Sequence, residues 1–250
     1  MRPADDDLPG LERYADAESA KRRVLYQLLD LGLPVNDDTL DFELKNSESE
    51  PVMTGHADGT VTLDLAEADD AQRTQRRSEL GEPYRTLVGH FRHELGHYYQ
   101  GIILTTERDW ERCRAVFGDE RESYQEALDR HYENGAREDW PDAFVSAYAT
   151  MHPWEDWAET FAHYLHIRDT LETAADFGLS VRGPQAAEGD EGFVATPEDA
   201  DPRGAFGALL EDWIPLTYAL NQINRSMGRG DPLPPSRSRS RRSTSSRSCT

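Results

Sequence analysis

The chain has few cysteines and no long run of apolar residues. Its 250 residues include two cysteines, Cys113 and Cys249, which are too few for a disulfide framework or a cysteine-based zinc ribbon. No segment approaches the roughly 18 apolar residues that a membrane-spanning helix needs. At the amino terminus, Asp5, Asp6 and Asp7 occupy the place where a secretory signal requires an apolar stretch. These absences predict a cytoplasmic protein.

Positive charge is also scarce. The sequence carries 27 lysines and arginines against 48 acidic residues, a formal net charge of −21. Such a surface argues against nucleic acid or an anionic membrane as a partner of the folded body. Residues 232–250 are rich in Arg and Ser and cannot bury enough apolar surface to fold, so this tail is predicted to be disordered and could bind RNA or the acidic body itself. Residues 1–231 are predicted to form one domain.

The apolar pattern predicts a mostly helical α+β fold. Apolar residues recur at helical spacing, and glycine or proline marks the ends of the segments. Predicted helices cover 11–32, 84–104, 107–116, 120–132, 154–177 and about 205–227, with a shorter helix or turn at 143–150. Alternating residues predict strands at 40–44, 52–54 and 60–65, the last two as a hairpin around 57–59. A small antiparallel sheet thus precedes the helix at 84–104, and 180–203 is predicted to be an irregular loop.

The most informative motif is His93-Glu94-Leu95-Gly96-His97, inside a predicted helix. Residues four apart on a helix face the same side, so His93 and His97 project together, one turn apart. Two imidazoles in this arrangement can hold one Zn²⁺ at roughly 2.0–2.1 Å, and Glu94 can act on a zinc-bound water. The simpler alternative is an exposed helix that carries two histidines and a glutamate by chance.

Two glutamates downstream, Glu155 and Glu159, are candidates for the third protein ligand that a catalytic zinc site needs. They are four residues apart on a predicted helix, so both carboxylates can face the same way. One can bind zinc while the other accepts the free ring N–H of a zinc-binding histidine. Trp154, Trp157 and Phe161 lie among them, and carboxylates on an apolar face are costly unless a metal or a donor compensates them. The alternative is a solvated acidic face.

The order His-Glu-x-x-His, then Glu-x-x-Ala-Glu-x-Phe, resembles the gluzincin metallopeptidases. Over about residues 10–228 the sequence resembles the bacterial putative zinc-binding metallopeptidase family, although it lacks the cysteines for the amino-terminal zinc ribbon that the family commonly carries. The resemblance implies a zincin-like domain. It implies that His93, His97 and Glu155 bind Zn²⁺, that Glu94 is the general base, and that Glu159 supports a zinc-binding histidine from outside the metal's ligand set.

Further residues are implied or suggested around this site. In toxin-type relatives with the same second motif, a tyrosine that stabilises the transition state lies seven residues before the glutamate ligand, which here is Tyr148. The alternative is that Tyr148 is an ordinary core or surface aromatic residue. His90 lies three residues before His93 and is a candidate for supporting the site from behind the ligands. His152 is an alternative donor to the oxyanion.

These residues together predict a zinc metallopeptidase that hydrolyses peptide bonds through a zinc-bound water, with Glu94 as general base. The predicted partner is a peptide or protein substrate, which would pair in extended form with the strand at 60–65. The alternative is a catalytically inactive metal-binding or protein-interaction domain that uses the same site. A third hypothesis is a non-enzymatic interaction protein that associates through its acidic body and its Arg/Ser tail.

Overall fold

The computed structural model is mostly helical, with a small sheet in its amino-terminal part. It describes residues 3–36, 38–47, 52, 54–68, 86–183, 194–195, 197 and 206–231. The helices are α1 (Leu8–Asp30), α3 (Leu87–Ile103), α4 (Glu107–Phe117), α5 (Tyr124–Asn134), α6 (Trp140–Ala143), α7 (Pro153–Asp176) and α8 (Phe206–Ser226), with the 3-10 turns η1 (Leu65–Ala68) and η2 (Tyr148–Thr150). The strands are β1 (Asp41–Lys45), β2 (Gly55–Ala57), β3 (Thr60–Asp64), β4 (Val181–Arg182) and β5 (Val194–Ala195). The α+β class is confirmed.

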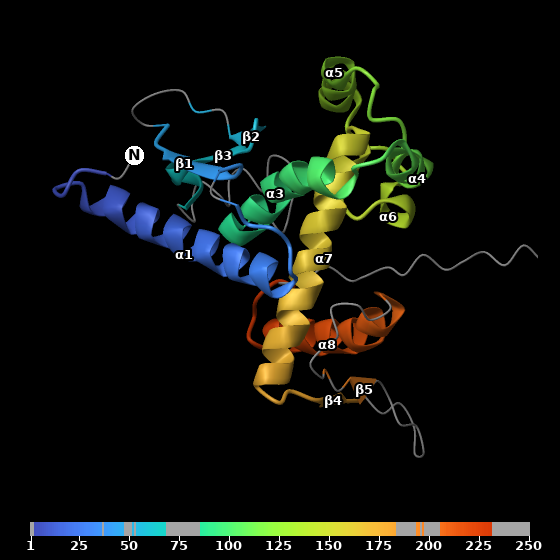
Figure 1. The fold of residues 1–250 in the computed structure, drawn as a ribbon. Coiled ribbons are helices and arrows are strands. Elements are labelled where there is room, and N and C mark those ends of the chain that lie inside the picture. Colours follow the sequence, from blue (N-terminus) through green and yellow to red (C-terminus); the bar gives the residue numbers. More distant parts are fainter. Residues whose placement is uncertain are drawn as a thin grey trace, which may run out of the picture.

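Helix α7 runs through the molecule and joins the part that contains α1, α3 and the three-stranded sheet to the part that contains α8 (Figure 1). Helix α3 crosses α7 near its amino-terminal half, and α1, β2 and β3 pack on α3. Helix α8 packs beside the carboxy-terminal half of α7, while α4 contacts the opposite half. The main core lies between α1, the sheet, α3 and α7, and its fully buried side chains include Val24, Leu28, Val61, Leu63, Phe91, Leu95, Tyr99 and Leu165.

The sheet differs from the prediction in two ways. Its strand order is β1-β3-β2, with β2 antiparallel to β3 but β1 parallel to it, so the sheet is mixed rather than antiparallel. Strand β3 occupies the centre, where the side chains of Val61 and Leu63 are fully buried. Because both of its edges are paired, the prediction that the strand at 60–65 offers a free edge to a substrate is wrong. The hairpin partner is β2, which begins at Gly55 and not in the predicted 52–54.

The predicted helices are present to within a few residues, with instructive differences. Helix α5 begins at Tyr124 and not at 120, because the Oγ of Ser123 accepts a hydrogen bond from the backbone N–H of Glu126 at 3.3 Å and caps the helix. The segment at 143–150 divides into the end of α6 and the turn η2. Two described pieces of the predicted loop at 180–203 pair as β4 and β5. The predicted tail at 232–250 lies outside the described residues.

None of the helices in the described part of the chain is long and apolar enough to cross a membrane. The cytoplasmic location and the single domain over 1–231 stay predictions.

Helices α3 and α7 approach each other closely at Gly96. A Cβ atom placed on Gly96 would lie 2.9 Å from the Cα of Ala158 and 3.3 Å from the Cβ of Phe161. The indole N–H of Trp157 donates to the carbonyl oxygen of Gly96 at 2.9 Å. Two small residues at the crossing therefore let the backbones meet, and an indole hydrogen bond fixes their relative position. This contact brings the side chains that flank Gly96 against the first turns of α7.

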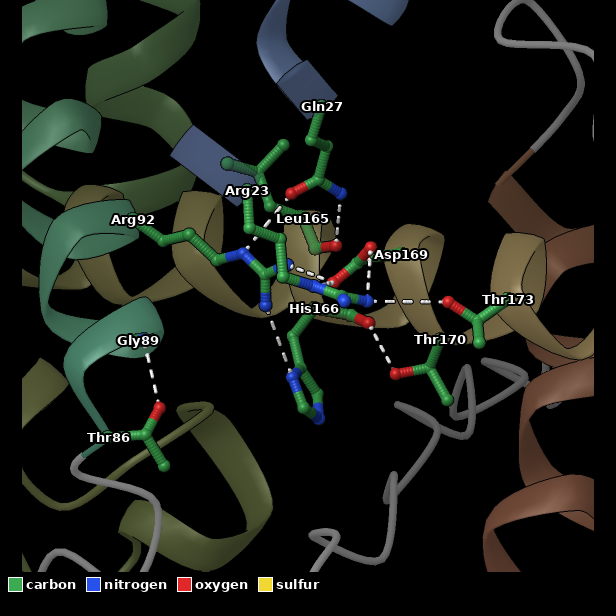
Figure 2. A network of polar contacts seen from close by, with 10 residues as sticks. All are labelled: Arg23, Gln27, Thr86, Gly89, Arg92, Leu165, His166, Asp169, Thr170 and Thr173. Atoms are coloured by element: carbon green, nitrogen blue, oxygen red, sulfur yellow. Dashed lines mark hydrogen bonds and ion pairs between the residues drawn. The ribbon is translucent and has the colours of Figure 1, made fainter. Parts of the chain in front are cut away.

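A buried polar network ties α1 to the same pair of helices (Figure 2). The guanidinium of Arg92, which is 2% exposed, donates to Asp169 on α7 at 2.6 Å and to the side chain of Gln27 on α1 at 3.2 Å. Gln27 in turn donates to the carbonyl oxygen of Leu165 at 2.6 Å. Arg23 on α1 makes two further hydrogen bonds to Asp169, at 2.9 and 3.0 Å. Since Arg92 precedes His93, this network fixes the part of α3 that carries the histidine motif.

A neutral histidine completes the network. The Nδ1 atom of His166 lies 3.4 Å from a guanidinium nitrogen of Arg92 (Figure 2). Burial and the charge of Arg92 lower the pKa of His166 to about 4. The ring is therefore uncharged at neutral pH, so it accepts a hydrogen bond from Arg92 without adding a second positive charge beside it.

Replacing Gly96 by alanine should separate the two helices. The new methyl group meets the backbone of Ala158, which cannot move aside as a side chain could. We expect Gly96→Ala to lower the free energy of unfolding by about 1–2 kcal/mol, because the cost of overpacking exceeds the gain in helix propensity. Gly101→Ala in the same helix is the matched control: nothing lies within 4 Å of its added Cβ, so it should stabilise by about 0.5–1 kcal/mol. Urea unfolding measures both, and a stabilised Gly96→Ala would contradict the close approach.

Removing the charge of Asp169 should leave Arg92 buried without its counter-charge. We expect Asp169→Asn to lower the free energy of unfolding by about 3 kcal/mol, since breaking a buried ion pair leaves an uncompensated charge. Asp176→Asn, an exposed change near the end of the same helix, should stay within about 0.5 kcal/mol of the unchanged protein. Equal effects of the two substitutions in urea unfolding would show that the network does not hold the helices together.

Candidate metal centre

Two imidazoles from α3 meet at their Nε2 atoms. His93 and His97 lie one turn apart, their ring planes differ by 80°, and their Nε2 atoms are 3.2 Å apart. The capping residue Thr86 accepts a hydrogen bond from the N–H of Gly89 at 3.0 Å (Figure 2), which begins α3 nearly two turns before the histidine motif. The structure thus presents two nitrogen atoms to one point, as the spacing of the motif predicts.

A carboxylate oxygen from α7 meets the same point. Glu155 lies in the first turn of α7, and its Oε2 is 3.0 Å from Nε2 of His93 and 3.6 Å from Nε2 of His97. Four ligands at about 2.05 Å around a tetrahedral zinc ion stand about 3.3 Å from one another. The three observed separations, 3.0, 3.2 and 3.6 Å, bracket that value. These three atoms could hold one metal ion.

The hydrogen bonding of the Glu155 carboxylate supports the binding of a metal ion by these three atoms. Its Oε2 is buried and makes no hydrogen bond of acceptable geometry among the described residues, although the Nε2 atom of His93 is close. A buried anionic oxygen without a donor is costly, and a cation at the meeting point would compensate it. The other oxygen, Oε1, accepts a hydrogen bond from the hydroxyl of Tyr124 at 3.0 Å. The donor set of two imidazoles and one carboxylate is one that zinc accepts.

Glu159 contacts the opposite edge of the His93 ring. Its Oε1 lies 2.7 Å from Nδ1 of His93, so Nδ1 donates to Glu159 and the ring turns its Nε2 toward Glu155 and His97. The side chain of Ser146 also contributes to lowering the pKa of Glu159. Glu155 and Glu159 therefore take different positions, one facing the two Nε2 atoms and the other behind the ring of His93.

Glu94 lies beside the two imidazoles, with His90 behind it. The Nε2 atom of His90 is 3.1 Å from Oε1 of Glu94, and both side chains are less than 10% exposed. The prediction placed His90 behind the metal ligands; in the structure it contacts the candidate base instead. Such a hydrogen bond fixes the direction of a carboxylate that would otherwise rotate freely.

The charges in this cluster favour a cation. Burial raises the pKa of Glu159, but His93 outweighs it and brings the pKa to about 2. Burial likewise opposes ionisation of Glu155 and Glu94, yet the neighbouring imidazoles hold both pKa values below the ordinary range. Burial alone would lower the pKa of His93, and Glu155 and Glu159 raise it well above its ordinary value. Three ionised carboxylates around two imidazoles make a site that attracts positive charge.

Tyr148 lies at the edge of this cluster, in the turn η2. Its ring centroid is 6.1 Å from that of His93 and 5.9 Å from that of His131 on α5. Its side chain also contributes to lowering the pKa of the Tyr124 hydroxyl. The structure thus brings all seven predicted site residues together: His90, His93, Glu94, His97, Tyr148, Glu155 and Glu159.

His152, the alternative oxyanion donor, has a structural position instead. Its Nδ1 accepts a hydrogen bond from the backbone N–H of Trp154 at 3.1 Å, and its Nε2 lies 3.2 Å from the carbonyl oxygen of Glu122. Both ring nitrogens are thus engaged, and the side chain is buried. His152 caps α7, which fixes the first turn that carries Glu155, and has no N–H left for a substrate.

Sequence reasoning missed two residues at the site, Tyr124 and His131. Tyr124 donates to Glu155 across 31 positions of sequence, and His131 packs on Tyr148. Burial and the charge of Glu155 raise the pKa of Tyr124 well above its ordinary value, so its hydroxyl stays protonated. Both residues lie on α5, which reads as an ordinary charged helix, so no sequence signal marked them.

The chain is similar to proteins of one family. The sequence pattern of the family described as "Putative zinc-binding metallo-peptidase" matches residues 10–239. An uncharacterised protein of Mycobacterium bovis and uncharacterised proteins of two strains of Mycobacterium tuberculosis are each 49% identical over 240 residues, which is 93% of this chain and 67% of the relative. No solved structure matches the chain.

Proposed function

Since this chain belongs to the family of putative zinc-binding metallo-peptidases, we propose that it is a zinc-dependent peptidase that hydrolyses bonds in peptide or protein substrates. The observation that carries the proposal is the meeting of three donor atoms, the Nε2 atoms of His93 and His97 and the Oε2 of Glu155, beside the carboxylate of Glu94. A structural zinc site has four protein ligands, whereas three leave a position for a reactant.

The residues that would hold zinc are His93, His97 and Glu155. When bound there, Zn²⁺ supplies Lewis acidity that polarises a carbonyl group and lowers the pKa of a water molecule toward about 7. Glu159 holds the proton on Nδ1 of His93, which keeps Nε2 available as a ligand and raises its basicity. Buried surroundings keep bulk water from weakening these contacts.

Glu94 is the proposed general base. Its pKa lies below the ordinary range, so the carboxylate is ionised at neutral pH and can accept a proton from the attacking water. The same group can then deliver that proton to the nitrogen of the leaving amine, because hydrolysis of a peptide bond requires one proton there. His90 keeps the carboxylate directed at the site through its hydrogen bond to Oε1.

Tyr148 is the proposed donor to the oxyanion that forms when water adds to the carbonyl. Its ring lies beside His93, and a hydroxyl on that side could reach an oxygen held at the site. Where such a donor has been removed from hydrolases, the loss is about 3–4 kcal/mol of transition-state stabilisation. His152, whose nitrogens are both engaged in capping, does not take this role.

An extended substrate can pair with strand β2. Within the described residues β2 is bonded on one side only, by β3. His56 on β2 packs against Tyr98, which follows the zinc-binding histidine candidate His97, and the charges of His97 and Glu94 act on the His56 ring. A peptide that adds to this edge would run alongside the proposed catalytic helix.

Replacing Glu94 by glutamine tests the function. The amide keeps the shape of the side chain but cannot take a proton, so we expect Glu94→Gln to bind one zinc ion per chain and to lose about 10²–10⁴-fold in peptidase rate. The assay is cleavage of a fluorescently labelled casein by the zinc-loaded protein, with metal content measured in parallel. Glu111→Gln, an exposed change on α4, is the control and should keep full activity.

Two results would contradict the proposal. Unchanged peptidase activity in Glu94→Gln would remove Glu94 from the mechanism. A zinc-loaded unchanged protein that cleaves neither labelled casein nor a diverse peptide library would favour the alternative of an inactive metal-binding domain.

A further inference from the structure

We propose that Tyr124 is a positioning residue for the metal centre: its hydroxyl holds one oxygen of Glu155 so that the other faces the two imidazoles. The inference rests on the proposed function, because it assumes that Glu155 binds the metal. It assigns to α5, a helix outside both sequence motifs, a part in building the site.

The contact itself selects which oxygen faces the metal position. The hydroxyl of Tyr124 donates to Oε1 of Glu155 at 3.0 Å, while Oε2 lies 3.0 and 3.6 Å from the Nε2 atoms of His93 and His97. The terminal torsion of a glutamate is broad and has no strongly preferred angle. A single donor on Oε1 therefore decides the orientation of the carboxylate, and it favours binding through one oxygen.

The ring of Tyr124 is itself held in place. It is the first residue of α5, directly after the capping residue Ser123. Its ring centroid lies 5.3 Å from that of His152 and 6.2 Å from that of Trp154, both at the start of α7. Tyr124 therefore packs on the same helix turn that carries Glu155, so the donor and the carboxylate keep a fixed separation.

The same hydroxyl is linked to Tyr148. The ring of Tyr148 lies between the rings of His93 and His131, and its side chain acts on the Tyr124 hydroxyl, whose pKa it helps to lower. His131 lies two turns after Tyr124 on α5. Two residues of α5, Tyr124 and His131, thus contact the carboxylate of Glu155 and the ring of the proposed oxyanion donor Tyr148.

Tyr124→Phe separates positioning from packing, because phenylalanine keeps the ring and removes only the hydroxyl. We expect zinc affinity, measured by competition with a chromophoric chelator, to fall about 10- to 100-fold. The visible absorption bands of the Co²⁺-substituted protein should also shift, because Oε1 becomes free to approach the metal. The gain in unfolding temperature that zinc gives should shrink in this variant.

Tyr132→Phe is the matched control, since Tyr132 lies on the same helix and is 69% exposed. It should keep the zinc affinity, the Co²⁺ spectrum and the zinc-induced gain in unfolding temperature of the unchanged protein.

The outcomes separate the inference from the proposed function. If Tyr124→Phe binds zinc as tightly as the unchanged protein and gives the same Co²⁺ spectrum, the inference is overturned and the zinc site stands. If the metal-free and zinc-loaded unfolding temperatures fall equally with an unchanged spectrum, Tyr124 has a packing role only, which also overturns it. If the unchanged protein binds no zinc, the proposed function and the inference both fail.

Discussion

The site depends on the close approach of α3 and α7 at Gly96. Each helix alone carries titratable side chains that would lack partners of opposite charge in the protein interior. Where the backbones meet, His93 and His97 from α3 face Glu155 from α7 at 3.0 and 3.6 Å. A larger residue at Gly96 would push Ala158 away, and a shift of even 1 Å would take the three atoms outside the separations that one metal ion allows.

The elements around this crossing hold it from several directions. On one side, the ion pair between Arg92 and Asp169 joins α3 to α7, and Arg23 and Gln27 tie α1 to the same two residues. At the start of α7, His152 uses both ring nitrogens to fix the turn that carries Glu155. From α5, Tyr124 holds the carboxylate itself. The cost of burying three acids and two imidazoles is thus offset by neighbours, and a cation at the meeting point would offset the part that remains.

Much of the site could be predicted because its parts are local. His93 and His97 lie four apart on one helix, as do Glu155 and Glu159 on another, and helical geometry alone then fixes which side chains face together. The sequence could not reveal that β1 runs parallel to β3, since strand order depends on how a connection of several residues crosses the sheet. Nor could it reveal Tyr124, whose contact with Glu155 exists only once α5 packs against α7, or the capping role of His152.

Metal analysis of two alanine variants tests the central claim most directly. The claim is that Glu155 faces the metal while Glu159 holds the back of His93. Zinc per chain should be close to one in the unchanged protein and in Glu159→Ala, with a weaker affinity in the latter, and close to zero in Glu155→Ala after dialysis against a weak chelator. Retention of a full equivalent of zinc by Glu155→Ala, with loss in Glu159→Ala, would contradict the account.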